Sequence, residues 1–110
     1  MIDWLQIKAL RDDVGAEDFE EVVEIFIEEV AEIVERLRSN PQLDTLGADL
    51  HAVKGSALNL GFTHFADLCQ TVKTLASEGR AEEIVLQPIL GSFKTSREAF
   101  LSGLAEGAAA

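Results

Sequence analysis

The sequence predicts an all-α protein, an antiparallel up-down-up-down four-helix bundle with an additional short N-terminal helix. Three observations lead to this prediction. Long stretches of the chain place apolar residues three or four positions apart, which is the period of an amphipathic helix. The connections between these stretches are short, as in bundles of antiparallel helices. No stretch alternates apolar and polar residues, or collects β-branched residues, over the length of a strand.

The chain has the size of one small domain. Its 110 residues can bury one modest core, so we expect a single domain over residues 1–110. The composition is 47% hydrophobic and 26% charged, with 2 prolines, which is typical of soluble globular chains rather than disordered ones. Residues 105–110 have no periodic apolar side chains left to bury, and we expect them to form a frayed tail.

The charge balance is strongly acidic. Twenty acidic residues against nine basic ones give a formal net charge of -11. This charge repels the phosphates of nucleic acids and anionic lipids, so we expect no nucleic-acid partner and no membrane partner. No stretch reaches the about 18 apolar residues of a membrane span, and the N-terminal residues lack the pattern of a signal peptide. We therefore expect a cytoplasmic protein.

The residues that commonly bind metals are few. The chain contains one cysteine, Cys69, and two histidines, His51 and His64. They lie far apart in the sequence, so we expect no metal site. A single cysteine cannot form an internal disulfide, and we expect Cys69 to be a small buried apolar residue. No motif includes His64, which we interpret as an ordinary polar residue.

The first two predicted helices differ in length. A short one covers about residues 2–13, ends before Gly15 and is expected to cover one end of the bundle. A long one covers residues 17–37 and ends before Asn40-Pro41. Its polar face carries nine of the 20 acidic residues, which we interpret as a solvated surface, with selection of partners by repulsion as the alternative. These acids are Glu17, Asp18, Glu20, Glu21, Glu24, Glu28, Glu29, Glu32 and Glu35.

The next two predicted helices form a hairpin. The third covers residues 43–60 and the fourth follows a turn at residues 61–63, with Thr63 as its N-cap, and ends at about residue 77. His51 lies outside the apolar stripe of the third helix. Two glycines on its face, Gly47 and Gly55, cost about 1 kcal/mol each relative to alanine, which suggests that another surface approaches closely there.

The last predicted helix covers about residues 81–104. Pro88 lacks a backbone donor, so it either kinks this helix or marks its true start. In the second case residues 82–85 form a separate turn.

The residues after His51 form the most informative pattern of the chain. In a helix, residues three and four positions on lie beside the histidine, and here they are a lysine and a glycine. An open imidazole next to a cation suits a phosphoryl group. Small residues follow at five and six positions, and a glycine at ten. The six positions are His51, Lys54, Gly55, Ser56, Ala57 and Gly61.

This run resembles the signature of the histidine-containing phosphotransfer (HPt) domain family, and the resemblance extends over about residues 9–104. It implies a phosphorelay intermediate, in which Nε2 of His51 accepts a phosphoryl group from the aspartyl phosphate of a receiver domain and passes it to another receiver. A neighbouring acceptor or a water can hold the other ring nitrogen, and the sequence does not say which group does so. Lys54 would attract the phosphoryl oxygens. The receiver, which can belong to a hybrid sensor kinase, would supply magnesium, so the chain needs no cofactor of its own.

The resemblance also implies a docking surface for receivers. Gly55 would allow the receiver to approach, and Ala48 and Leu58 would form an apolar patch. We interpret Ser56 as a small residue that keeps the surface low, with a hydrogen bond to the phosphoryl group as the alternative. Asn59 would be a polar contact at the rim, and Gly61 would serve the turn.

Two other functions remain open at this point. One is an interaction module that binds a receiver or kinase without accepting phosphate. The other is a dimerising kinase scaffold, but Ala52 stands where such helices carry an acid next to the histidine. The chain has no glycine-rich nucleotide lid and no P-loop, so we expect no ATP-dependent kinase activity of its own, and we expect a monomer.

Overall fold

A computed structural model describes residues 2–107, and within this range the protein is all-helical, which confirms the predicted class. The described residues form five α-helices and one turn of 3-10 helix, and no helix among them is apolar over enough of its length to span a bilayer. The elements are α1 (Trp4–Val14), α2 (Ala16–Ser39), α3 (Leu43–Asn59), α4 (Thr63–Ser77), η1 (Ala81–Glu83) and α5 (Gln87–Ala105).

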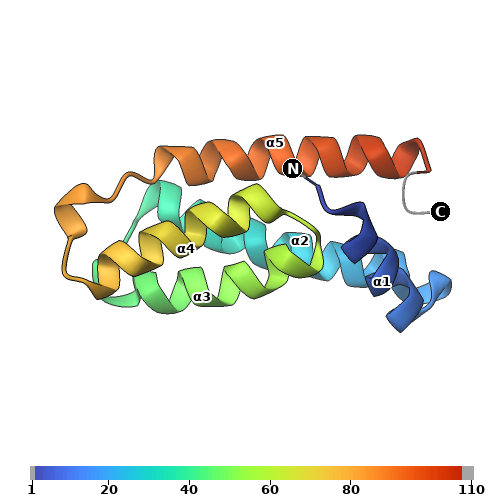
Figure 1. Cartoon of the computed structure of the whole chain (residues 1–110), viewed down its shortest axis with the longest axis horizontal. Coiled ribbons are helices and arrows are strands. Elements are labelled where there is room, and N and C mark those ends of the chain that lie inside the picture. The colour runs from blue at the N-terminus through green and yellow to red at the C-terminus, as the bar shows by residue number, and fades with distance from the viewer. Residues whose placement is uncertain (1, 108–110) are drawn as a thin grey trace.

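The molecule is elongated, with extents of 43 × 22 × 20 Å. Helices α2 to α5 extend along its long axis and α1 lies at one end (Figure 1). Contacts join α2 to α3, α3 to α4, α4 to α5, and α5 back to α2, whereas α1 packs against α2 and α3. The short N-terminal helix therefore covers one end, as expected.

The apolar stripes predicted from the sequence form the core. In α3 the buried residues are Leu46, Leu50, Val53 and Ala57, which are each at most 1% exposed and lie three or four positions apart. Cys69 of α4 is fully buried, as predicted. Burial of such side chains stabilises the fold by about 25 cal/mol per Å² of apolar surface.

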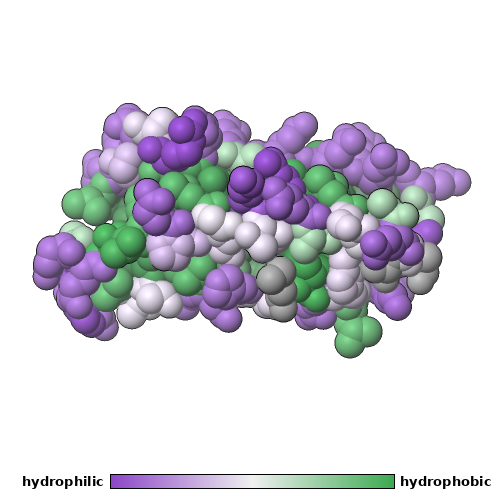
Figure 2. Space-filling model, turned by 90° about the horizontal axis from the view of Figure 1, so that it is seen from above, coloured by the Kyte–Doolittle hydropathy of each residue, from purple (hydrophilic) through white to green (hydrophobic). Residues whose placement is uncertain are grey.

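Polar side chains cover the outside. All nine acidic residues predicted for the outer face of α2 are exposed. Seen from the side of α5, the surface is mostly hydrophilic, with hydrophobic residues between the polar side chains (Figure 2).

The turn between α3 and α4 requires a glycine. Gly61 has a φ of 72°, which side chains other than glycine rarely adopt. Its carbonyl oxygen accepts a hydrogen bond of 2.8 Å from the backbone N–H of Asp3, and a Cβ at Gly61 would lie 2.6 Å from the Asp3 carbonyl oxygen. Gly61 thus serves the turn, as expected, and this turn is joined directly to the residues that precede α1.

The N-cap predicted for the fourth helix is wrong by one position. Thr63 is the first residue of α4, and Phe62 occupies the N-cap without a side-chain hydrogen bond. Phe62 is fully buried, and its N–H donates to the carbonyl of Ala57. Burial of this aromatic ring, rather than the capping preference of a hydroxyl, sets where the helix begins.

Pro88 marks the start of the last helix and does not kink it. Helix α5 begins at Gln87, so the proline lies in the first turn, where no intrahelical N–H is needed. A separate turn, η1, precedes α5, but it covers Ala81–Glu83 rather than the expected residues 82–85. Helix α5 ends at Ala105, and residues 108–110 of the predicted tail lie outside the described residues.

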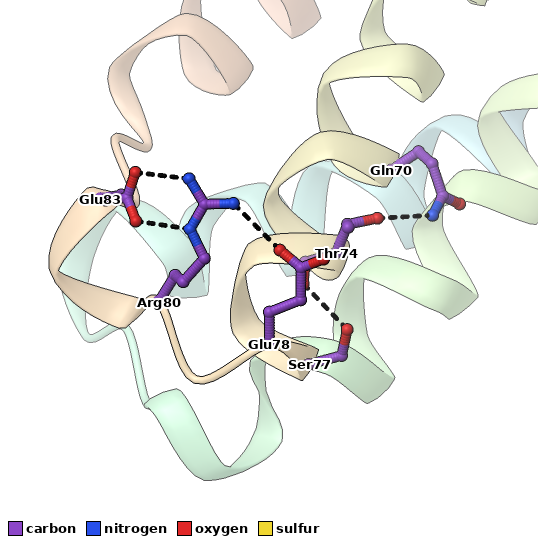
Figure 3. Close-up of polar contacts among 6 residues, drawn as sticks. All are labelled: Gln70, Thr74, Ser77, Glu78, Arg80 and Glu83. Carbon is purple, nitrogen blue, oxygen red and sulfur yellow. Dashed lines mark hydrogen bonds and ion pairs between the residues drawn. The ribbon is translucent and has the colours of Figure 1, made fainter.

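An arginine forms hydrogen bonds within the segment that links α4 and α5. Arg80 donates to both carboxylate oxygens of Glu83, at 2.5 and 2.7 Å, and to Glu78 at 3.1 Å (Figure 3). These hydrogen bonds raise the pKa of Arg80, and the one with Glu83 lowers the pKa of that carboxyl. All three side chains are exposed, so the pairs orient the turn more than they stabilise it.

Candidate functional site

His51 lies on the outer face of α3. The buried stripe of this helix faces the core, and the imidazole is exposed on another side. Ala48 and Gly55, one turn before and after it, are exposed as well, and Leu58 is 44% exposed. A Cβ added at Gly55 would meet nothing within 4 Å. The predicted docking residues therefore surround the histidine with a low, open surface.

Lys54 is held beside this surface by α4. Its ammonium donates a hydrogen bond of 2.7 Å to Oε1 of Gln70, and the side chain is half-buried. The amide of Gln70 in turn donates to Oγ1 of Thr74 at 3.1 Å, one turn further along the helix (Figure 3). This chain of hydrogen bonds fixes the position of the cation before any ligand arrives.

A second lysine contacts the imidazole itself. Nζ of Lys73, also on α4, lies 3.3 Å from Nδ1 of His51. Since an ammonium group has donors and no acceptor, Nδ1 accepts this hydrogen bond. The sequence left the partner of this nitrogen open, and the structure places Lys73 of α4 there.

The geometry of the hairpin explains both contacts. His51 lies eleven residues before Phe62 and Lys73 eleven residues after it, and Lys54 and Gln70 are each eight residues from it. An antiparallel pair of helices brings such symmetric positions together. Sequence analysis missed Gln70 and Lys73 because the motif lies within α3, but counting outward from the turn could have found them.

The other two predicted polar residues bond within the protein. Ser56 is half-buried, and its hydroxyl donates to Oε2 of Glu29 on α2 at 3.0 Å. The amide of Asn59 donates to the carbonyl of Gly55 at 3.2 Å. Five positions separate Ser56 from His51, so Ser56 lies well round the helix on the α2 side. This placement favours the small-residue interpretation of Ser56 over a hydrogen bond to phosphate.

Two lysines lie on the side of His51 that faces α4. Lys73 contacts the ring, and Lys54, three residues on in α3, bonds to Gln70, while Asp49 of α3 is paired with Arg36 of α2 at 2.8 Å. Beneath this surface, burial raises the pKa of the Cys69 thiol to about 12, an effect that the charge of Lys54 only partly offsets. The thiol therefore stays protonated and does not compete with the imidazole as a nucleophile.

His64 lies apart from this site. It is exposed at the start of α4 and lines a shallow groove with residues of α5, among them Ser92 and Ser96. Within residues 2–107, no group of three or more histidine, cysteine or acidic residues is arranged to hold a metal ion. His51 with its two lysines is thus the arrangement whose chemistry is most specific.

Fold and site together define a class of protein: an all-helical domain that exposes one histidine beside two lysines on adjacent helices. The Hpt domain family model matches residues 21–104, and the chain belongs to this family. The matched range contains α3, α4 and α5 and most of α2. Comparison with curated proteins and with solved structures gave no match. Membership implies histidine phosphotransfer in a phosphorelay, where Hpt domains interact with receiver domains.

Proposed function

We propose that this protein is a phosphorelay intermediate that carries a phosphoryl group on His51 from one receiver domain to another. The observation that supports this most is the exposed imidazole with Lys54 three residues on in the same helix, its ammonium held by Gln70. In the first transfer, the lone pair of Nε2 forms the N–P bond. The O–P bond of the receiver's aspartyl phosphate breaks, and its electron pair leaves on the aspartate carboxylate. The second transfer is the reverse reaction with another aspartate.

Lys54 stabilises the charge of the phosphoryl oxygens during both transfers. Its hydrogen bond to Gln70 keeps the ammonium in place, so little reorganisation is needed when the phosphoryl group arrives. Magnesium held by the receiver completes this stabilisation, and the chain needs no cofactor of its own.

The receiver docks on the open face of α3. Gly55 and Ala48 let it approach the imidazole, Leu58 adds apolar contact area, and Ser56 and Asn59 border the surface. Receiver domains of response regulators, including one within a hybrid sensor kinase, are the partners that this surface suits.

The proposal extends to the architecture and the setting. Helices α2 to α5 form an up-down-up-down four-helix bundle, which their closed ring of contacts supports. The domain acts as a monomer in the cytoplasm, where the receivers of such relays are found.

Phosphotransfer from loaded receivers tests this function. Receivers phosphorylated with acetyl phosphate should transfer label to the wild-type protein and to a His64→Gln variant, but not to His51→Gln. Wild-type protein that stays unlabelled across a panel of receivers would contradict the proposal. Unchanged binding and signalling by His51→Ala would instead favour an interaction module that carries no phosphate.

A further inference from the structure

The contact between Lys73 and His51 favours a protonation state of the ring in which Nε2 cannot act as a nucleophile. Attack by Nε2 requires a lone pair on that nitrogen, so the proton of the neutral ring must sit on Nδ1. Lys73 directs an ammonium group at Nδ1 from 3.3 Å. Because an ammonium can only donate, it favours the ring that has its lone pair on Nδ1 and its proton on Nε2.

Gln70, another α4 side chain with contacts on this side, does not reverse this preference. Of the residues that α4 directs to this side, Gln70 accepts from Lys54 and donates to Thr74, so its amide is already bonded. Lys54 adds a second positive charge near the ring. The side chains that α4 supplies here thus favour an unprotonated Nδ1.

We propose that Lys73 is a positioning residue that opposes the loading of free His51 and retains the phosphoryl group once it is bound. The second part deepens the proposed function and rests on it, whereas the effect on the free ring does not. Lys73 acts through the protonation of Nδ1 and does not contact the transferred group.

The two effects follow from where the proton must be at each step. Before attack, the proton leaves Nε2 and Nδ1 gains one, both by exchange with water, and the contact with Lys73 breaks. The lone pair of Nε2 then forms the N–P bond as the O–P bond of the donor breaks, and the ring becomes positively charged. It loses the Nδ1 proton to water, and Lys73 can donate to the restored lone pair.

The phosphoryl group is retained on His51 because its loss requires a proton on Nδ1 again. When the N–P bond breaks, its electron pair returns to Nε2, and the departing ring is neutral only if Nδ1 carries a proton. Lys73 occupies the Nδ1 lone pair and repels the positive charge that protonation would create. Phosphorylated His51 therefore persists longer than it would without Lys73.

Nitrogen NMR tests the free ring without any phosphate. The chain has two histidines, so a His51→Gln variant assigns both rings, and His64 serves as an internal reference. In neutral rings of the wild type we expect the proton of His51 on Nε2. In Lys73→Glu it should move to Nδ1, because a carboxylate only accepts. A wild-type ring with its proton on Nδ1, or no change in Lys73→Glu, would overturn the proposal.

The lifetime of the loaded ring tests the second part. Phosphoramidate, a small-molecule phosphoryl donor, loads the protein without a receiver, and phosphorus NMR follows the loss of phosphate from His51. We expect the half-life in Lys73→Met to be about fivefold shorter than in the wild type, which corresponds to about 1 kcal/mol. Lys73→Arg keeps a hydrogen-bond donor, so its half-life should be close to that of the wild type.

The matched control is Lys94→Met, which removes one exposed lysine from α5 and should leave the half-life unchanged. Circular dichroism establishes that each variant is folded. An unchanged half-life in Lys73→Met would overturn the proposal, and a longer one would show that Lys73 delivers a proton to the departing ring. Protein that loads from phosphoramidate but exchanges with no receiver would contradict the proposed function and leave this result intact.

Discussion

At the scale of single residues, the proposed function gives Lys54 and Gly55 different tasks in α3. Lys54 supplies charge from a fixed position, and Gly55 supplies empty space. Substitutions at the two positions should therefore separate the chemical step of phosphotransfer from the binding of the receiver.

Loss of the Lys54 charge should slow transfer more than it weakens binding. A charge-assisted contact is worth about 1.5–3 kcal/mol, so Lys54→Ala should lower the transfer rate from a saturating receiver by about tenfold or more. One cation at the edge of a docking surface adds much less to affinity. Rapid-quench transfer assays and a binding titration measure the two effects, with Lys94→Ala as the control. Equal losses in transfer rate and receiver affinity would contradict the prediction that Lys54 acts mainly on the transfer step.

A large side chain at Gly55 should weaken receiver binding more than it slows the transfer step. Gly55→Ala should raise the free energy of unfolding by up to about 1 kcal/mol, because alanine favours a helix and its Cβ meets nothing. Gly55→Leu should remain folded but weaken receiver binding. Gly91 of α5 is also exposed in open space, and Gly91→Leu is the matched control. Receiver affinity that falls equally in both leucine variants would argue against a docking surface at Gly55.

The buried thiol gives the stability of the protein a dependence on alkaline pH. Burial raises the pKa of Cys69 from 9.0 to about 12, so the folded protein binds this proton more tightly than the unfolded chain. The associated stability is fully present below pH 9.0 and is lost as the pH rises toward 12, by up to about 1.4 kcal/mol per unit. Urea unfolding at several alkaline pH values should show this slope in the wild type. Cys69→Ala should lack it, and the same slope in both proteins would contradict the prediction.

At the scale of elements, the α3–α4 hairpin is the part that builds the site. Its turn combines a left-handed glycine, a buried aromatic ring at the N-cap and a hydrogen bond to Asp3. The turn sets which residue of α4 faces His51. A change in the turn should therefore affect both the free energy of unfolding and phosphotransfer at His51.

Gly61→Ala tests this turn. The left-handed conformation costs a residue with a Cβ about 1–2 kcal/mol, and the close backbone of Asp3 adds to this. We expect the free energy of unfolding to fall by at least about 1 kcal/mol, measured by thermal and urea unfolding. Gly91→Ala, at an open position in α5, should not lower it. Unchanged stability in Gly61→Ala would show that the turn can relax away from Asp3.

The helices themselves were largely predictable because each depends on local periodicity. The stripes of α2 and α3 and the breaks at Gly15 and Pro88 are visible in the sequence, and the structure follows them. The start of α4 was misplaced because the burial of Phe62 is a tertiary effect that outweighs a capping preference.

The site was predictable only in part, for a related reason. The motif from His51 to Gly61 lies in one helix and its turn, so its residues could be found from spacing alone. Gln70 and Lys73 belong to another helix, and their roles depend on the register of the hairpin. The same register explains why the partner of the second ring nitrogen could not be named from the sequence.

At the scale of the whole molecule, charge is divided unevenly. The protein has a formal net charge of -11, and the outer face of α2 is lined with exposed acids, yet two lysines lie on the side of His51 that faces α4. The charge of Lys54 would attract a phosphoryl group, while the acidic surface disfavours acidic partners that approach from other directions. A receiver should therefore be selected by the orientation in which it arrives as well as by its shape.

The placement of Lys73 also bears on how such domains can diverge. With the role proposed for Lys73, a phosphoacceptor helix could keep every position of its motif while the facing helix exchanges one side chain and so changes the lifetime of the signal. Timing and partner choice would then depend on separate helices, so evolution or a protein engineer could adjust one and leave the other alone.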